Sequence, residues 1–267
     1  MKKFGKALYI GLIFLFLYLP IFTLVFLSFN NSLTPSSTWR GFTLKWFAEI
    51  FSREEWIEAL VNTLVIGLLA AGIATVVGVA ASGGIMALSR RQRIVILQLT
   101  NIPMVNAEIV TAISLVLGFA LFGISLSMGT ILFAHICFCL PYVILNVMPK
   151  LRQTGNVAYE AARDLGAGPI KAFFSVVLPD IMPGVVTGFL MSFTMSVDDF
   201  VITYFTRPVG INTLSTLIYS QQKVGLRTSM CALSTLIFLL VLLVLLVRMF
   251  LTGRAAADKS TNGGVIN

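Results

Sequence analysis

YEAARDLGAGPIKAFFSVVLPDIMPG, residues 159–184, lies between two long apolar segments of the chain. Residues 157–165 have the spacing of a short amphipathic helix, and two glycines follow at Gly166 and Gly168. Helices commonly end at a glycine in the left-handed conformation, which other residues adopt only at a cost. We therefore expect this helix to end in a tight or left-handed turn at Gly166.

A second short helix is predicted directly after the turn. Pro169 suits the first turn of a helix, where its missing N–H is not needed, and residues 170–177 continue the helical pattern until Pro179. Two short helices joined by a glycine turn form a knob that could bind in a groove of a partner protein. The other interpretation from the residues alone is an amphipathic loop that rests on a membrane.

The composition is that of a membrane protein. Of the 267 residues, 57% are hydrophobic and 11% are charged, and the mean hydropathy is +0.93. Soluble domains carry about 25% charged residues, and several apolar runs here reach the roughly 20 residues that span a bilayer. The net charge of +8 then indicates basic cytoplasmic loops rather than a nucleic-acid partner.

Six membrane-spanning helices are predicted. They cover approximately residues 8–29, 60–88, 99–123, 128–148, 181–203 and 230–250. With the N-terminus inside, thirteen of the 19 lysines and arginines lie on the cytoplasmic side, in agreement with the positive-inside rule. The expected fold is an all-α, polytopic membrane helix bundle with both termini cytoplasmic. Residues 1–252 form its transmembrane domain, and residues 253–267 are expected to be a disordered cytoplasmic tail.

Three acidic residues interrupt the apolar segments: Glu108, Asp198 and Asp199. A carboxylate inside a bilayer is costly and normally faces the bundle interior or a water-filled path. The spans offer no lysine or arginine placed to pair with these acids, so a substrate that carries positive charge would suit them. Phe200 and Tyr204 follow, and aromatic rings attract alkylammonium groups. We expect these five residues to line a substrate path; structural pairing with another subunit is the alternative.

The cytoplasmic loop resembles that of the permease subunits of ATP-binding cassette importers. Their signature is Glu-Ala-Ala, three residues, Gly, nine residues, Ile, one residue and Leu-Pro. The same spacing is present here in Glu160, Ala161, Ala162, Gly166, Val176, Leu178 and Pro179. Only Val176 departs from the signature, and it keeps a β-branched side chain. The resemblance implies that this coupling loop, about residues 150–180, contacts an ATP-binding subunit.

Residues 196–200, followed by Tyr204 and Phe205, resemble the second permease subunits of spermidine/putrescine importers. The resemblance implies a second permease subunit that is a different chain, two ATP-binding subunits and an external substrate-binding protein. The chain contains no Gly-x-x-x-x-Gly-Lys-Ser/Thr phosphate loop. ATP and Mg²⁺ are therefore expected to bind to the partner subunits, and no cofactor to this chain.

No combination of catalytic or metal-ligating residues stands out. His135, the only histidine, is expected to be a hydrogen-bonded packing residue. The three cysteines, Cys137, Cys139 and Cys231, lie in apolar segments and are expected to be small core side chains. We do not expect the chain to be an enzyme.

The sequence thus predicts a permease subunit in the cell inner membrane, surrounded by lipid, that belongs to an ATP-driven importer. It would translocate polyamines such as spermidine and putrescine by alternating access. The first alternative keeps the importer and changes the cargo to another cation, an amino acid or a metal chelate. The second is an ion-coupled carrier that acts alone, with Glu108 and the two aspartates as ion sites. A non-transporting scaffold would leave the loop signature unexplained.

Overall fold

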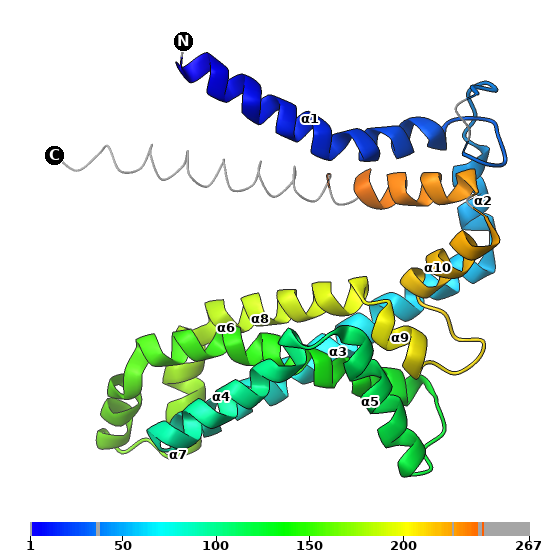
Figure 1. Cartoon of the computed structure of the whole chain (residues 1–267). Helices are drawn as coiled ribbons and strands as arrows, with labels where there is room; N and C mark the ends of the chain where they lie inside the picture. The colour runs from blue at the N-terminus through cyan, green and yellow to red at the C-terminus, as the bar shows by residue number, and fades with distance from the viewer. Residues whose placement is uncertain (1, 36–37, 226, 240–241, 243–267) are drawn as a thin grey trace. The chain divides into compact units, whose positions relative to one another are not determined.

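The computed structural model describes residues 2–35, 38–225, 227–239 and 242. The all-α prediction is confirmed: the described residues are mainly helical, and their only β pairing is an isolated bridge between Asn30 and Phe42. Figure 1 shows the helices in chain order. They are α1 (Lys2–Ser28), α2 (Lys45–Ser52), α3 (Glu54–Ala87), α4 (Arg90–Val105), α5 (Glu108–Leu121), α6 (Met128–Asp164), α7 (Pro169–Ala172), the π-helical turn η1 (Phe173–Val177), α8 (Leu178–Asp198), α9 (Val201–Thr206) and α10 (Leu214–Val224).

In the described part of the chain, four helical stretches are long and apolar enough to cross a membrane: Leu8–Ser28, Glu54–Ala87, Met128–Gln153 and Pro169–Asp198. The pair α4 and α5 would make a fifth span if counted as one. The sixth predicted span begins in a shorter apolar helix, Thr228–Leu239, and the rest of it lies outside the described residues, as does the predicted tail. The count of six spans and the cytoplasmic termini therefore stay predictions.

The described helices belong to two compact units, one within Met1–Glu54 and Ile218–Asn267 and the other within Glu55–Leu217. In the first unit, Trp46 of α2 is buried, and its indole N–H donates to the Asn30 carbonyl oxygen at 2.8 Å. The Thr228 N–H donates to the Leu33 carbonyl oxygen at 3.1 Å. These bonds tie the loop after α1 to α2 and to the start of the last described helix.

The third predicted span, residues 99–123, is not one helix. It is divided between α4 and α5, which meet at an angle of 103° (Figure 1). Asn106 and Ala107 between them have extended backbone conformations, with ψ of 150° and 132°. Pro103 removes one backbone donor just before the break, and asparagine is a weak helix former. Because residues 99–123 are mainly apolar, their sequence predicts a single span despite these local signals.

The two helices predicted around Gly166 are longer than expected. Residues 157–165 are not a separate helix but the last turns of α6, which continues for 37 residues from Met128 to Asp164. The apolar pattern ends near residue 148, but a polar sequence without proline after Pro149 can extend a helix into water. Gly155 lies in this extension, and a helix tolerates one glycine at a cost of about 1 kcal/mol.

Pro179 does not end the second helix, contrary to the prediction. The chain passes from α7 through η1 directly into α8. In the π turn the Leu178 N–H donates to the Phe173 carbonyl oxygen, five residues earlier. The shifted hydrogen-bond register lets the helix pass a proline, which has no N–H for the usual bond to residue i−4.

In the second unit, α6 and α8 pack against each other and run side by side (Figure 1). The face of α8 toward α6 carries a small, buried residue at every fourth position: Gly184, Gly188, Ser192 and Ser196. A Cβ built at Gly188 would lie 3.2 Å from the Val143 Cα atom of α6. Small residues at this spacing let two membrane helices bring their backbones together. We call this face the small-residue seam.

We expect Gly184→Ala to lower the Tm of the purified protein complex. A Cβ at this position would lie 2.8 Å from both the Asn146 carbonyl oxygen and the Lys150 Cγ atom, so α6 and α8 would have to separate. Overpacking of this kind costs about 1–3 kcal/mol. Gly72→Ala in α3 is the matched control, because a Cβ there meets nothing within 4 Å. A Tm for Gly184→Ala equal to that of the control would show that the seam tolerates a wider spacing.

Candidate functional site

The turn at the end of α6 has the geometry expected for Gly166. This residue has a φ of +86°, the left-handed conformation. The Gly166 N–H donates to the Arg163 carbonyl oxygen at 2.9 Å, and the Ala167 N–H donates to the Ala162 carbonyl oxygen at 3.0 Å. This pair of bonds is a Schellman motif, which satisfies carbonyl groups at a helix C-terminus. The prediction of a left-handed turn at Gly166 is confirmed.

The helix that follows the turn starts as predicted. Gly168 is the N-cap of α7, and Pro169 is its first residue. Glu160 and Ala161 of the signature are exposed on the last turns of α6, whereas Ala162 is half-buried. Leu178 is half-buried at the start of α8, and Pro179 beside it is exposed. The signature therefore combines residues that shape the loop with residues that a partner protein can reach.

Three further apolar side chains of the coupling loop, which were not predicted as site residues, are exposed. They are Leu165, Ile170 and Phe174, with exposed fractions of 89%, 73% and 60%. An apolar surface on a projecting loop is typical of a protein-binding surface. Their only sequence signal is that they are apolar residues within an otherwise polar helix–turn–helix segment.

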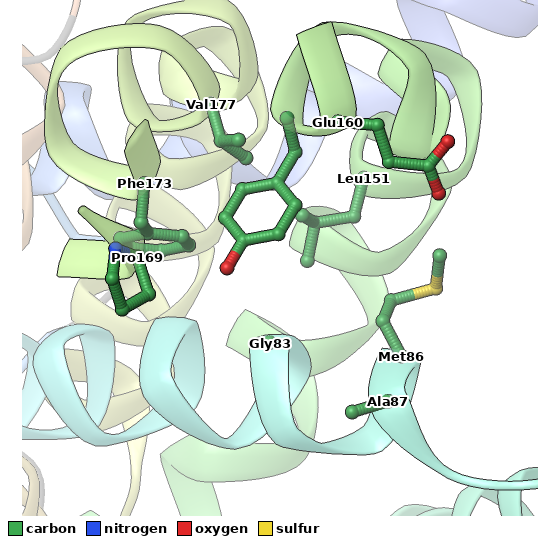
Figure 2. A pocket seen from close by; sticks show the side chains of 9 residues that line it. Gly83, Met86, Ala87, Leu151, Glu160, Pro169, Phe173 and Val177 are labelled. Carbon is green, nitrogen blue, oxygen red and sulfur yellow. The ribbon is translucent and has the colours of Figure 1, made fainter. Parts of the chain in front are cut away.

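A cavity of about 390 Å³ lies between the coupling loop and the C-terminal end of α3. Figure 2 shows Pro169 and Phe173 of the loop on one side, and Met86 and Ala87 of α3 on another. The Glu160 carboxylate lies at the far end of the cavity from Pro169. The remaining lining residues are Gly83, Leu151, Tyr159 and Val177. The lining is mainly apolar with a single carboxylate, so it suits an apolar or basic side chain.

The two aspartates that interrupt the fifth predicted span lie where that span is broken. α8 ends at Asp198, and α9 begins at Val201, so residues 181–203 are not one continuous helix. Asp199 has an extended backbone with ψ of 128° and is buried, whereas Asp198 is exposed. Two adjacent acids thus have opposite environments.

The Asp199 carboxylate caps α9. Its Oδ1 atom accepts a hydrogen bond from the Ile202 N–H at 3.2 Å. Its Oδ2 atom accepts from the Thr203 N–H at 2.8 Å and from the Thr203 hydroxyl at 2.9 Å. A side-chain oxygen that binds the free N–H groups of a first helical turn is the usual N-cap interaction. These bonds satisfy both carboxylate oxygens.

His135 of α6 joins this buried group. Its Nε2 atom lies 2.9 Å from the Thr203 hydroxyl oxygen and 3.5 Å from Asp199 Oδ2, and its Nδ1 atom lies 2.6 Å from the Ser196 hydroxyl oxygen. The prediction of a hydrogen-bonded packing residue is confirmed. Its proximity to Asp199 was not predicted from the sequence. His135 and Asp199 are far apart in the sequence, and no local pattern joins them.

Glu108 approaches the aspartates from the other broken span. It is the first residue of α5, immediately after the break at Asn106 and Ala107, and it is exposed. α5 packs against α9, and Glu108 lies close enough to Asp198 and Asp199 for their like charges to repel one another. Two helix breaks that are about 90 residues apart in the chain thus bring the three predicted acids into one region, which we call the acid cluster.

The aromatic residues after the aspartates pack as a group. The ring centroids of Phe200 and Tyr204 are 5.3 Å apart, and those of Tyr204 and Phe205 are 5.5 Å apart. The guanidinium carbon of Arg207 lies 5.5 Å from the Tyr204 ring centroid. In this structure the cation next to the Tyr204 ring is Arg207 of the chain itself, so the predicted contact between this ring and a substrate stays a prediction.

The cysteines and the described acids make no metal site. All three cysteines are free; Cys139 and Cys231 are buried, and Cys137 is half-buried, which agrees with their prediction as core side chains. In the described part of the chain, no three His, Cys, Asp or Glu side chains are grouped to hold a metal ion.

Comparisons with known proteins agree with this geometry. A sequence model of the family described as "Binding-protein-dependent transport system inner membrane component" matches residues 74–255. The chain is 33% identical over 251 residues to the spermidine/putrescine transport system permease protein PotC of Haemophilus influenzae, covering 94% of this chain and 97% of that protein. It is 34% identical over 253 residues to the putrescine transport system permease protein PotI of Escherichia coli K12, covering 92% and 90%.

A solved structure has the same fold. It is a bacterial ABC transporter involved in the import of the acidic polysaccharide alginate, and a chain of it superimposes with a TM-score of 0.71. The sequences are 17% identical, and the match covers 95% of each chain.

We expect Asp199→Asn to lower the Tm of the purified complex and Asp198→Asn to leave it unchanged. An amide offers one acceptor oxygen where the Asp199 carboxylate binds three donors, so the cap of α9 is weakened. A buried donor left without an acceptor costs about 1–3 kcal/mol, whereas the exposed Asp198 makes no comparable cap. Thermal unfolding of the two variants, each compared with wild type, measures the difference. Equal Tm values for the two variants would contradict the division of roles between these acids.

Proposed function

The chain belongs to the family of binding-protein-dependent transport system inner membrane components, and we propose that it is the permease subunit of an ATP-driven importer of polyamines. As a member of this family it is a transport permease rather than a catalytic subunit. Spermidine and putrescine are the cargo that the names of its relatives suggest. The acid cluster is the observation on this chain that carries the proposal.

The acid cluster suits a cargo with several positive charges. Glu108 and Asp198 are exposed side chains from different helices, and the Asp199 carboxylate lies beside them. A carboxylate that lies among apolar helices loses part of its hydration, and a bound cation compensates for that loss. Phe200 and Tyr204 add aromatic faces next to this region, and such faces attract alkylammonium groups. A linear polyamine has positive charges that suit the carboxylates and an alkyl chain that suits the aromatic faces.

The coupling loop is the proposed contact with an ATP-binding subunit. Its exposed apolar residues and the cavity beside Glu160 support this role. ATP and Mg²⁺ bind to two such partner subunits, which hydrolyse ATP, and this chain holds no cofactor.

A second permease, encoded as a different chain, completes the membrane part. An external substrate-binding protein delivers the polyamine, in keeping with the description of the family. Alternating access then moves the polyamine inward.

The proposed topology has six spans and both termini in the cytoplasm. The excess of basic residues on one side of the spans supports it. The coupling loop is then cytoplasmic, where an ATP-binding subunit can reach it, and the loop before α3 is external.

We expect Asp198→Asn and Glu108→Gln each to lower uptake of radiolabelled spermidine at subsaturating concentration by a factor of about 10 to 150. The loss of one charge-assisted contact with the cation costs about 1.5–3 kcal/mol. Vesicles that hold the complete importer, internal ATP and the external binding protein are the assay, and the Tm should not fall.

Uptake without ATP or without the ATP-binding subunits would instead support an ion-coupled carrier. If unlabelled amino acids or metal chelates inhibit the uptake of radiolabelled spermidine more strongly than putrescine does, the chain is still an importer subunit, but the proposed polyamine cargo is wrong.

We expect Gly166→Val to abolish uptake and Gly168→Ala to preserve it. Gly166 has a φ of +86°, where a residue with a Cβ is strained by about 1–2 kcal/mol and a β-branched one by more. Gly168 has a φ of −62°, and a Cβ added there would meet nothing within 4 Å, so alanine fits. Abundance in the membrane, co-purification of the ATP-binding subunits and uptake are measured together. Normal uptake by Gly166→Val at normal abundance would remove this turn from the coupling mechanism.

The topology is tested with single cysteines in a variant from which the three native cysteines are removed. A cysteine at position 90 or 160 should react only with a reagent that enters the cytoplasm. A cysteine at position 45 should react with an impermeant reagent added outside. Labelling of all three positions from the same side would contradict the proposed topology.

A further inference from the structure

The buried group around His135 has one consistent direction of proton donation. The Asp199 carboxylate accepts from the Thr203 hydroxyl at 2.9 Å, so the single hydroxyl proton of Thr203 is used there. The Thr203 oxygen must then accept from His135 Nε2, which lies 2.9 Å away. His135 Nδ1 is left as an acceptor for the Ser196 hydroxyl at 2.6 Å. Hydrogen bonds are thus donated from Ser196 to His135, from His135 to Thr203 and from Thr203 to Asp199.

This chain of hydrogen bonds is closed to water. His135 and Thr203 are each 1% exposed, Ser196 is 4% exposed and Asp199 is 7% exposed. It connects α6, through His135, with the last turn of α8 and the first turn of α9. A buried polar group left without its partner costs about 1–3 kcal/mol, so the members hold one another in place.

Asp199 is therefore held in place rather than available to a cargo. Backbone N–H groups and the Thr203 hydroxyl occupy its oxygens, and a cation could approach them only if the cap of α9 were given up. Asp198 is the preceding residue and is exposed, and it lies close enough to Glu108 for their like charges to repel each other. The backbone conformation at Asp199 sets where the end of α8, and with it the Asp198 side chain, lies.

We propose that His135 is a positioning residue for the transported cation: through Thr203 it fixes Asp199 and the break between α8 and α9, and so presents Asp198, together with Glu108, to the cargo. This inference rests on the proposed function and divides the acid cluster into two acids that meet the cation and one that holds the break. His135 itself does not touch the cargo.

Two substitutions at His135 separate its two hydrogen bonds. In His135→Gln, the amide nitrogen can occupy the place of Nε2 and donate to Thr203. In His135→Asn, the shorter amide lies nearer the place of Nδ1, so it keeps a bond to Ser196 and loses the one to Thr203. If positioning passes through Thr203, His135→Asn raises the KM for spermidine uptake about tenfold, and His135→Gln keeps it within about twofold.

A double-mutant cycle with Asp198→Asn distinguishes positioning from packing. When Asp198 no longer carries charge, its position matters little, so His135→Asn should raise the KM no further in that background. Ser192→Ala is the matched control: Ser192 lies one helical turn before Ser196 in the same seam, and its hydroxyl donates to the Cys139 carbonyl oxygen at 3.2 Å. Its effect on the KM should be small and the same in both backgrounds.

Several outcomes would overturn the inference. They are an unchanged KM in His135→Asn, an equal KM in the Gln and Asn variants, and the same fold-change with and without the Asp198 charge. If the importer with His135→Asn does not assemble, Thr203→Val takes its place in the double-mutant cycle. Valine keeps the shape of the threonine side chain and removes its hydroxyl group. Thr203→Ser, which keeps the hydroxyl group, is then the control variant expected to leave the KM unchanged. A wild-type importer that takes up no polyamine would overturn the proposed function itself, which the wild-type measurement shows before any variant is compared.

Discussion

The close approach of α6 and α8 is the constraint on which the rest of the second unit depends. Inside a bilayer the hydrophobic effect does not hold helices together, because lipid tails are as apolar as leucine side chains, so contact and hydrogen bonding must do so. The small-residue seam supplies both. Gly184 and Gly188 let the backbones meet, and Ser192 and Ser196 bond to Cys139 and His135.

Both candidate sites are attached to this helix pair. α8 leads out of the coupling loop through η1 and ends at Asp198, and α6 ends in the same loop at Asp164. The seam from Gly184 to Ser196 covers about 18 Å of helix at a rise of 1.5 Å per residue. Close-packed interiors are stiff and transmit strain, and this helix pair extends from the loop to the acid cluster. Where α8 leaves the loop, the π turn η1 departs from the α-helical hydrogen-bond register.

The acid cluster shows how one broken helix gives two adjacent carboxylates different chemistry. In an unbroken α8, Asp198 and Asp199 would project about 100° apart around the helix axis, and Asp199 would have no free helix N-terminus to cap. Because the backbone becomes extended at Asp199, its side chain turns back to cap α9 and is buried against His135, while Asp198 stays exposed. A carboxylate saturated by donors stabilises the fold, whereas an exposed one can exchange water for a cationic ligand. Composition alone cannot make this distinction.

The sequence by itself determined the features that depend on a few neighbouring residues. Apolar runs of sufficient length indicated membrane helices, and Gly166 and Pro169 predicted the left-handed turn and the helix start that the structure contains, since both follow from local backbone sterics. Only the structure revealed that α6 continues to Asp164, that η1 carries the helix past Pro179, and that the third span is broken, although Pro103 and Asn106 are local signals of that break. It also decided that His135 meets Asp199 and that Glu108 joins the aspartates. Those contacts join positions dozens of residues apart, and packing between helices, not any local pattern, sets them.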